Sequence, residues 1–210
     1  MLGLDFRSLT VGPLETNCYL LWDIDTRCTA IVDPGGDRGR IASQIQALDL
    51  RIEWVLLTHG HPDHTFCAGS LASEYGARTG MHPSDAPLLA DGLELAEMFY
   101  DLSGHLPFSP TDLLADGRII RLRESEIRVA HTPGHSRGGL CFVTEVGVFC
   151  GDTLFAGSVG RTDLAGGSFE QLIKSIESKL LTLDDAVPLY PGHGPATTVG
   201  AERQSNPYLQ

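Results

Sequence analysis

Residues 58–65 read THGHPDHT and directly follow the run RIEWVLL at residues 51–57. The run is apolar and partly β-branched, so it predicts a buried strand. Three of the chain's eight histidines then fall at the end of that strand, with Asp63 between two of them. The stretch is a polar turn, a one-metal site or half of a larger site, and only residues elsewhere in the sequence distinguish these interpretations.

Short β-rich segments and single amphipathic helices occur along the whole chain. Runs of β-forming residues broken by Gly, Pro or Asp predict strands over residues 4–11, 17–24, 28–36, 51–59, 77–82, 118–122, 126–132, 139–145, 147–155 and 186–194. Apolar spacing and helix-end residues predict helices over residues 37–48, 63–75 and 168–183, and one or two short helices within 83–117. Gly76 is expected to end the second of these helices, and the third is amphipathic, with one apolar face formed by Phe169, Leu172, Ile173, Ile176 and Leu180. Clustered strands separated by single helices indicate sheets with helices outside them.

Composition disfavours several classes of partner. The chain has 210 residues, 42% of them hydrophobic, which suits one domain with a real core. The formal net charge of −12 disfavours nucleic acid and anionic membranes, because both favour Lys and Arg. No apolar run is long enough to span a membrane. Asp5 and Arg7 interrupt any signal peptide, and five cysteines without a CxxC pair predict reduced thiols. We therefore expect a cytoplasmic protein with a small-molecule substrate, and the oligomeric state stays open.

Polar residues of the same kind follow three later strands. His135 lies in VAHTPGHS, Asp152 in VFCGDTLF and His193 in PLYPGHG. Loops at one end of a sheet converge in space, and scaffolds usually carry their chemistry there. We therefore expect these three residues to join the first motif in one site.

The spacing within the first motif indicates two metal ions. His59 and His61 point the same way in extended backbone, so they can share one ion. Asp63 and His64 are adjacent at a predicted helix start and point elsewhere, so they can serve a second ion. The three later residues would complete both groups, with His135 in the first, His193 in the second and Asp152 as a bridge.

The donor types indicate the metal and its chemistry. Imidazole and carboxylate donors without thiolate favour zinc, with iron or manganese as alternatives. Two divalent ions outweigh the charges of Asp63, Asp152 and a bridging hydroxide, so such a site remains a Lewis acid. Metal-bound water can have its pKa lowered to about 7, which supplies hydroxide at neutral pH.

The motifs together resemble those of the metallo-β-lactamase superfamily. THGHPDH fits the pattern T-H-x-H-x-D-H, and TPGHS, GDTLF and PGHG follow in that family's order. GDTLFAGSVGRTDLAGG and ERQSNPYL are more specifically similar to small glyoxalase II-like (hydroxyacylglutathione hydrolase-like) proteins. The resemblance implies the metal ligands His59, His61, Asp63, His64, His135, Asp152 and His193.

The same resemblance implies a fold. The expected class is α+β, a four-layer αβ/βα sandwich of two mixed sheets with helices outside. Residues 1–210 would form a single domain, without the long helical C-terminal region that full-length glyoxalase II uses to hold glutathione.

The resemblance also implies an activity. A binuclear thioesterase of the glyoxalase II type would convert an S-2-hydroxyacylglutathione to a 2-hydroxy acid and glutathione, by attack of a metal-bridging hydroxide. Asp63 and Asp152 are its expected catalytic carboxylates. The alternative is a mononuclear iron persulfide dioxygenase on the same fold, which resembles this chain at GRTD and uses a subset of these ligands.

Four further residues are candidates beside the metal ligands. Arg161 either faces the substrate or holds its own loop by a salt bridge, and the loop role is favoured; Arg137 and Arg203 are weaker candidates for binding a substrate carboxylate. Asp33, in IVDPGG, either orients a ligand histidine or only forms a turn before Pro and Gly. The remaining histidines, His82, His105 and His131, are expected outside the ligand set.

Overall fold

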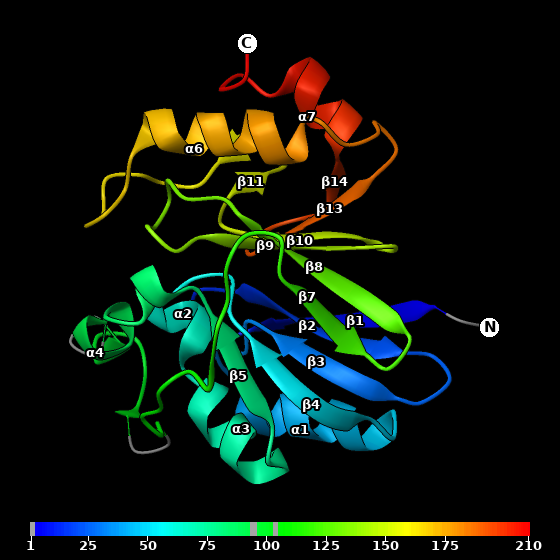
Figure 1. The fold of residues 1–210 in the computed structure, drawn as a ribbon. Coiled ribbons are helices and arrows are strands. Elements are labelled where there is room, and N and C mark those ends of the chain that lie inside the picture. Colours follow the sequence, from blue (N-terminus) through cyan, green and yellow to red (C-terminus); the bar gives the residue numbers. More distant parts are fainter. Residues whose placement is uncertain (1–2, 93–95, 103–104) are drawn as a thin grey trace.

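Two six-stranded sheets face each other, and helices cover the outer face of each (Figure 1). The computed structural model describes residues 3–92, 96–102 and 105–210. The predicted α+β class and four-layer αβ/βα sandwich of two mixed sheets are confirmed. Within the described residues, no helix is long and apolar enough to cross a membrane.

The first sheet contains the N-terminal strands in chain order. Its strands are β1 (Leu4–Val11), β2 (Thr16–Asp23), β3 (Cys28–Val32), β4 (Arg51–Leu56), β5 (Arg78–Met81) and β6 (Asp112–Leu113). The pairs β1–β2 and β2–β3 are antiparallel, whereas β3 to β6 run parallel. Every residue of β2 and β3 is buried, as expected for central strands covered on both faces.

The second sheet has the order β14-β13-β10-β9-β8-β7. Its strands are β7 (Ile119–Leu122), β8 (Ser125–His131), β9 (Leu140–Thr144), β10 (Gly147–Gly151), β13 (Pro188–Pro191) and β14 (Thr197–Thr198), and a separate small ribbon pairs β11 (Leu154–Phe155) with β12 (Ser158–Val159). Only β10 and β13 pair in parallel. Between the two sheets lies a core that includes the edge-to-face rings of Tyr19 and Phe149.

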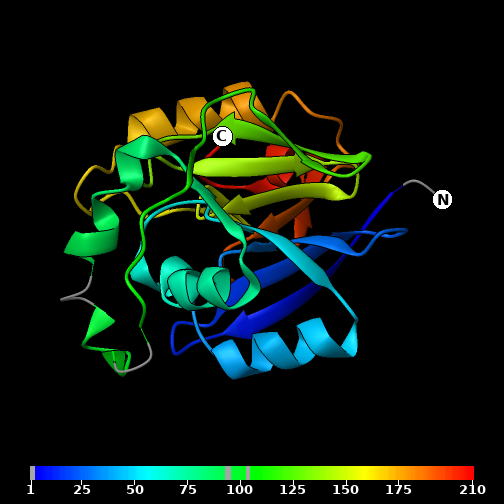
Figure 2. The same cartoon turned by 60° about the horizontal axis from the view of Figure 1, so that its bottom comes forward.

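Helices form the two outer layers. The first sheet is covered by α1 (Arg38–Ala47) and α3 (Ala68–Tyr75), which come forward in Figure 2. The second is covered by α6 (Phe169–Ser175), its π-helical continuation η3 (Ile176–Leu180) and α7 (Val199–Ser205). The short helices α2 (Pro62–Thr65), η1 (Pro83–Asp85) and α4 (Leu88–Asp91) lie in connections.

Two helix predictions need correction. The single helix expected over 63–75 is two helices, because the Cys67 N–H donates to the Pro34 carbonyl and leaves the helical ladder. Gly76 does end α3, in the left-handed conformation. Phe169 was expected on the buried face of the later helix, but it is the first residue of α6 and is 49% exposed.

Four strands end at the same edge of the sandwich. β4 leads into His59, β8 into His135, β10 into Asp152 and β13 into His193. Gly35, in the turn after β3, packs so closely on this edge that an added Cβ would overlap the carbonyl oxygen of Asp63. The edge therefore depends on backbone contacts that have no room for a side chain.

We expect Gly35→Ala to lower the free energy of unfolding by about 1–3 kcal/mol, the usual cost of overpacking. Gly39→Ala, four residues later, is the control, because nothing lies within 4 Å of its added Cβ and alanine favours a helix. Urea unfolding measures both variants. Equal stability of the two would show that the Gly35 contact is not tight.

Candidate metal centre

The seven histidine and aspartate side chains expected to bind metal converge at this edge. Three groups of them have ligand atoms that all lie within 4.8 Å of one another: His59, His61 and His135; His59, His64 and Asp152; and Asp63, His64 and His193. The groups share members, so they form one continuous centre. The other three histidines belong to none of these groups. Two of them, His82 and His131, have stacked rings whose centroids lie 4.1 Å apart.

In the first group, three imidazole nitrogens face one another. His135 Nε2 lies 3.3 Å from His59 Nε2 and 2.9 Å from His61 Nδ1. The Arg161 carbonyl lies 2.8 Å from His135 Nδ1 and can only accept a hydrogen bond, so the Nδ1 atom carries the proton. The Nε2 atom of His135 therefore faces the other two rings, an arrangement that a cation would satisfy.

His59 is oriented in the same way by Thr58. The Thr58 hydroxyl donates to Asp33 Oδ2 over 2.6 Å, and its oxygen lies 3.1 Å from His59 Nδ1. The hydroxyl proton is used by Asp33, so the oxygen accepts from His59 Nδ1–H. The Nε2 lone pair of neutral His59 then points at His135. Thr58 was not predicted as a site residue, although it is the threonine of the THGHPDH motif.

The other two groups share the fully buried His64. Its Nδ1 atom lies 2.9 Å from Asp33 Oδ2 and donates to it. The opposite nitrogen, Nε2, lies 3.5 Å from Asp63 Oδ2 and 3.4 Å from Asp152 Oδ1. His193 Nε2 lies 3.2 Å from Asp63 Oδ2.

Two buried atoms at this centre indicate that a metal ion would fit there. His64 Nε2 and Asp152 Oδ1 are both buried without a hydrogen-bond partner. Buried polar atoms are normally satisfied, and a divalent cation would satisfy both of these at once. The donor set, imidazole and carboxylate without thiolate, suits zinc, iron or manganese.

Asp152 lies between the groups. Its Oδ1 atom faces His64, whereas its Oδ2 atom lies 3.7 Å from His135 Nε2 and 3.8 Å from His193 Nε2. Asp152 thus lies between His135 of the three-histidine group and His64 and His193 of the other group, which is the placement that a bridging carboxylate needs.

The pKa values of His59 and His61 are shifted in the opposite direction from that of His64. Burial lowers the pKa of His59 and, with His135, lowers that of His61 to about 4. Both are therefore neutral near pH 7, and neutral imidazole is the form that binds metal. Burial disfavours the charged form of His64, but the three surrounding carboxylates outweigh burial and raise its pKa. A divalent cation would replace the proton that His64 otherwise holds.

Asp33 contacts the centre directly. Its carboxylate accepts from the Thr58 N–H and hydroxyl as well as from His64 Nδ1. Its φ of 50° also places it in a tight turn. Asp33 therefore has both roles that the sequence left open: it forms a turn, and its side chain orients the candidate ligand His64.

The two arginines are placed differently from each other. Arg161 forms a two-point ion pair with Asp163, at 2.8 and 2.7 Å, so its guanidinium holds its own loop. Arg137 is exposed two residues after His135, its stem close to Gly166, and within the described residues no carboxylate pairs with it. It lines a hollow of about 190 Å³ together with Ser84.

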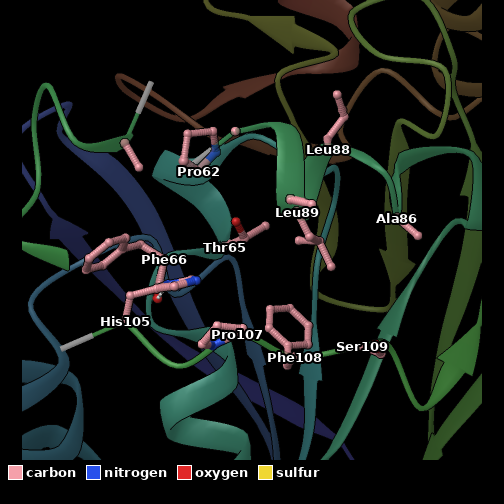
Figure 3. Close-up of a pocket in the computed structure, with 13 residues that line it drawn as sticks. Pro62, Thr65, Phe66, Ala86, Leu88, Leu89, His105, Pro107, Phe108 and Ser109 are labelled. Carbon is pink, nitrogen blue, oxygen red and sulfur yellow. Dashed lines mark hydrogen bonds between the residues drawn. The ribbon is translucent and has the colours of Figure 1, made fainter. Parts of the chain in front are cut away.

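An apolar pocket of about 240 Å³ lies beside α2 (Figure 3). Pro62, Thr65 and Phe66 line it from the metal loop, and Leu89 and Phe108 line it from the segment after β5. None of the seven candidate ligands lines it. The pocket therefore backs the metal loop and does not hold the centre itself.

We expect Asp33→Asn to weaken binding of one metal ion by about 10–100-fold, the usual cost of losing a partner that orients a ligand. The amide places an N–H group opposite existing donors and disturbs the tautomer of His64. Titration with Co²⁺ in competition with a chromogenic chelator measures this affinity.

Asp23→Asn is the matched control. Asp23 is 2% exposed, against 1% for Asp33, and also accepts from one backbone N–H and from hydroxyls. Thr16, at the start of β2, lies beside the centre, with its hydroxyl 3.5 Å from Asp63 Oδ2. Asp23 lies at the other end of the same strand, roughly 23 Å away. Wild-type metal affinity in Asp33→Asn would contradict the orienting role.

Comparison with known proteins gives a consistent result. Residues 11–193 match the sequence model of the metallo-beta-lactamase superfamily. The hydroxyacylglutathione hydrolase GloC of Haemophilus influenzae is 38% identical, with 98% of each chain covered. Two crystal structures superpose closely. The BLEG-1 B3 metallo-beta-lactamase has a TM-score of 0.88 and 32% identity, covering 98% of this chain and 100% of that one. TTHA1623, solved in a di-iron-bound form, has a TM-score of 0.86 and 34% identity, covering 97% and 100%.

Proposed function

The chain belongs to the metallo-β-lactamase superfamily, and we propose that it is a two-metal hydrolase that cleaves S-2-hydroxyacylglutathione or a closely related thioester. The position of Asp152 carries this proposal, because its carboxylate lies between His135 of the three-histidine group and His64 and His193 of the other group. The similarity to the hydroxyacylglutathione hydrolase GloC supports the substrate class.

The proposed reaction is hydrolysis. Water adds its oxygen to the thioester carbonyl carbon, the C–S bond breaks, and a 2-hydroxy acid and a thiol leave. Two divalent ions, when bound, would polarise the carbonyl and supply hydroxide near neutral pH. Zinc is our first candidate and iron the second, since TTHA1623 was solved with two irons.

The chain's own residues would hold the two ions, and the carboxylates among them supply negative charge. His59, His61 and His135 would hold one ion, and Asp63, His64 and His193 the other, with Asp152 between them. Burial opposes ionisation of Asp63, but His64 and His193 outweigh it and hold its pKa well below the usual range. Such a carboxylate is a weak proton acceptor near pH 7, so we assign Asp63 first as a ligand and only second to proton handling.

We propose Arg137 as the residue that contacts a carboxylate of the substrate. It follows His135 closely in sequence, it is exposed, and it lines a hollow. Arg161 is the second candidate, because Asp163 already engages its guanidinium.

The setting of the reaction is also part of the proposal. Residues 1–210 would act as one domain in the cytoplasm on a small molecule, and not on nucleic acid or a membrane. The net charge of −12 and five buried, unpaired thiols support this.

Hydrolysis of S-lactoylglutathione by metal-loaded protein, followed by ultraviolet absorbance, tests the proposed activity. We expect turnover, with a higher kcat/KM than for a chromogenic cephalosporin. His193→Ala should lower kcat/KM by roughly 100-fold or more through loss of electrostatic stabilisation, and Asp23→Asn should retain it. Absence of turnover with two ions bound would rule out thioesters of this class as substrates. A higher kcat/KM for the cephalosporin would favour a lactamase.

The same variant separates hydrolysis from the persulfide dioxygenase alternative. A one-iron enzyme would use a subset of these ligands and would leave His64 and His193 outside the metal shell. Oxygen uptake on glutathione persulfide that survives His193→Ala, with one iron per chain, would favour the dioxygenase.

A further inference from the structure

Asp85 is a fully buried carboxylate behind the first group of candidate ligands. It ends the short helix η1, which follows β5 in the connection between β5 and β6 of the first sheet. Its Oδ2 atom accepts from the Gly60 N–H at 3.1 Å and from the Ser136 hydroxyl at 2.6 Å. Its Oδ1 atom accepts from the Gly138 N–H at 2.6 Å.

The donors to Asp85 belong to two separate metal-binding loops. Gly60 lies between His59 and His61, and Ser136 directly follows His135. The first loop leaves β4 of the first sheet and the second leaves β8 of the second sheet. One side chain therefore joins both halves of the three-histidine group across the gap between the sheets.

The contact is built into the backbone around it. An added Cβ at Gly138 would lie 2.7 Å from the carboxyl carbon of Asp85, so the close approach needs glycine there. A backbone hydrogen bond from Leu140 N–H to the Thr58 carbonyl joins the same loops at 2.7 Å. Asp85 joins the same two loops a second time, because its buried carboxylate accepts three hydrogen bonds from them. These bonds lie next to the candidate ligands, whereas the Leu140–Thr58 bond lies at the strand end.

We propose that Asp85 is a positioning residue, which fixes the His59–His61 loop against the His135 loop and thereby sets the affinity of the three-histidine group for its metal ion. The carboxylate also places a negative charge behind the three-histidine group, which favours a cation in front of it. The inference rests on the two-metal centre proposed above and is independent of the substrate.

Asp85→Asn tests the proposal. The asparagine amide is isosteric, but it has only one acceptor oxygen, so at least one of the three donors meets an N–H group. Asp23→Asn is again the control, because Asp23 is equally buried with three donors and lies away from the metal loops. Co²⁺ titration with the ligand-field absorption spectrum as readout measures the two sites separately.

We expect Asp85→Asn to weaken one Co²⁺ site by about 10–100-fold and to alter its spectrum, with the other site near wild-type affinity. Asp23→Asn should bind both ions as wild type does, even if it unfolds at lower urea. If Asp85→Asn loses stability but keeps both affinities and the spectrum, Asp85 only supports the fold and the proposal is wrong. If wild-type protein does not bind two ions, the proposed two-metal centre fails instead.

Ser136→Ala keeps the proposal testable if Asp85→Asn does not fold. It removes one donor and leaves the carboxylate with two backbone partners. We expect a weaker effect in the same direction, several-fold in the affinity of the same site. Unchanged affinity and spectrum in Ser136→Ala would overturn the proposal.

Discussion

The central constraint on this molecule is a group of acceptor atoms that face one another. The Nε2 lone pairs of His59 and His135 are directed at each other because Thr58 and the Arg161 carbonyl occupy the opposite ring nitrogens. Next to them, a buried imidazole nitrogen of His64 and an oxygen of Asp152 have no hydrogen-bond partner. Such an arrangement is unfavourable unless positive charge lies between the atoms. The fold therefore maintains, at one edge, a geometry that divalent cations would stabilise.

The sandwich supplies this geometry through strand ends and buried carboxylates. Strands of both sheets end at the same edge, so loops far apart in sequence meet there. Asp33 fixes His64 from the first sheet, and Asp85 joins the first sheet's loop to that of His135. Both are nearly inaccessible to solvent and each accepts three hydrogen bonds. Loops alone would leave the ligands mobile, whereas these two carboxylates link them to the core.

Local sequence predicted what depends on local interactions. The longer strands, helix α1 and the end of α3 at Gly76 follow from periodicity and helix-end residues, whereas the two-residue strands β6, β12 and β14 were not predicted. The seven candidate ligands lie together as the motifs indicated. The break between α2 and α3 was missed, because it depends on a hydrogen bond from Cys67 to Pro34, thirty-three positions earlier. Asp85 was missed for the same reason: its donors are 25, 51 and 53 positions away, and SDAP carries no motif. Contacts of this range depend on the assembled sheets.

The central claim is that this edge holds two metal ions bridged by Asp152. Anomalous X-ray diffraction from crystals of the metal-loaded protein tests it most directly, because it locates each ion among its ligands. The account predicts two peaks per chain, one among His59, His61 and His135 and one among Asp63, His64 and His193, with Asp152 contacting both. A single peak, or two peaks without Asp152 between them, would contradict it.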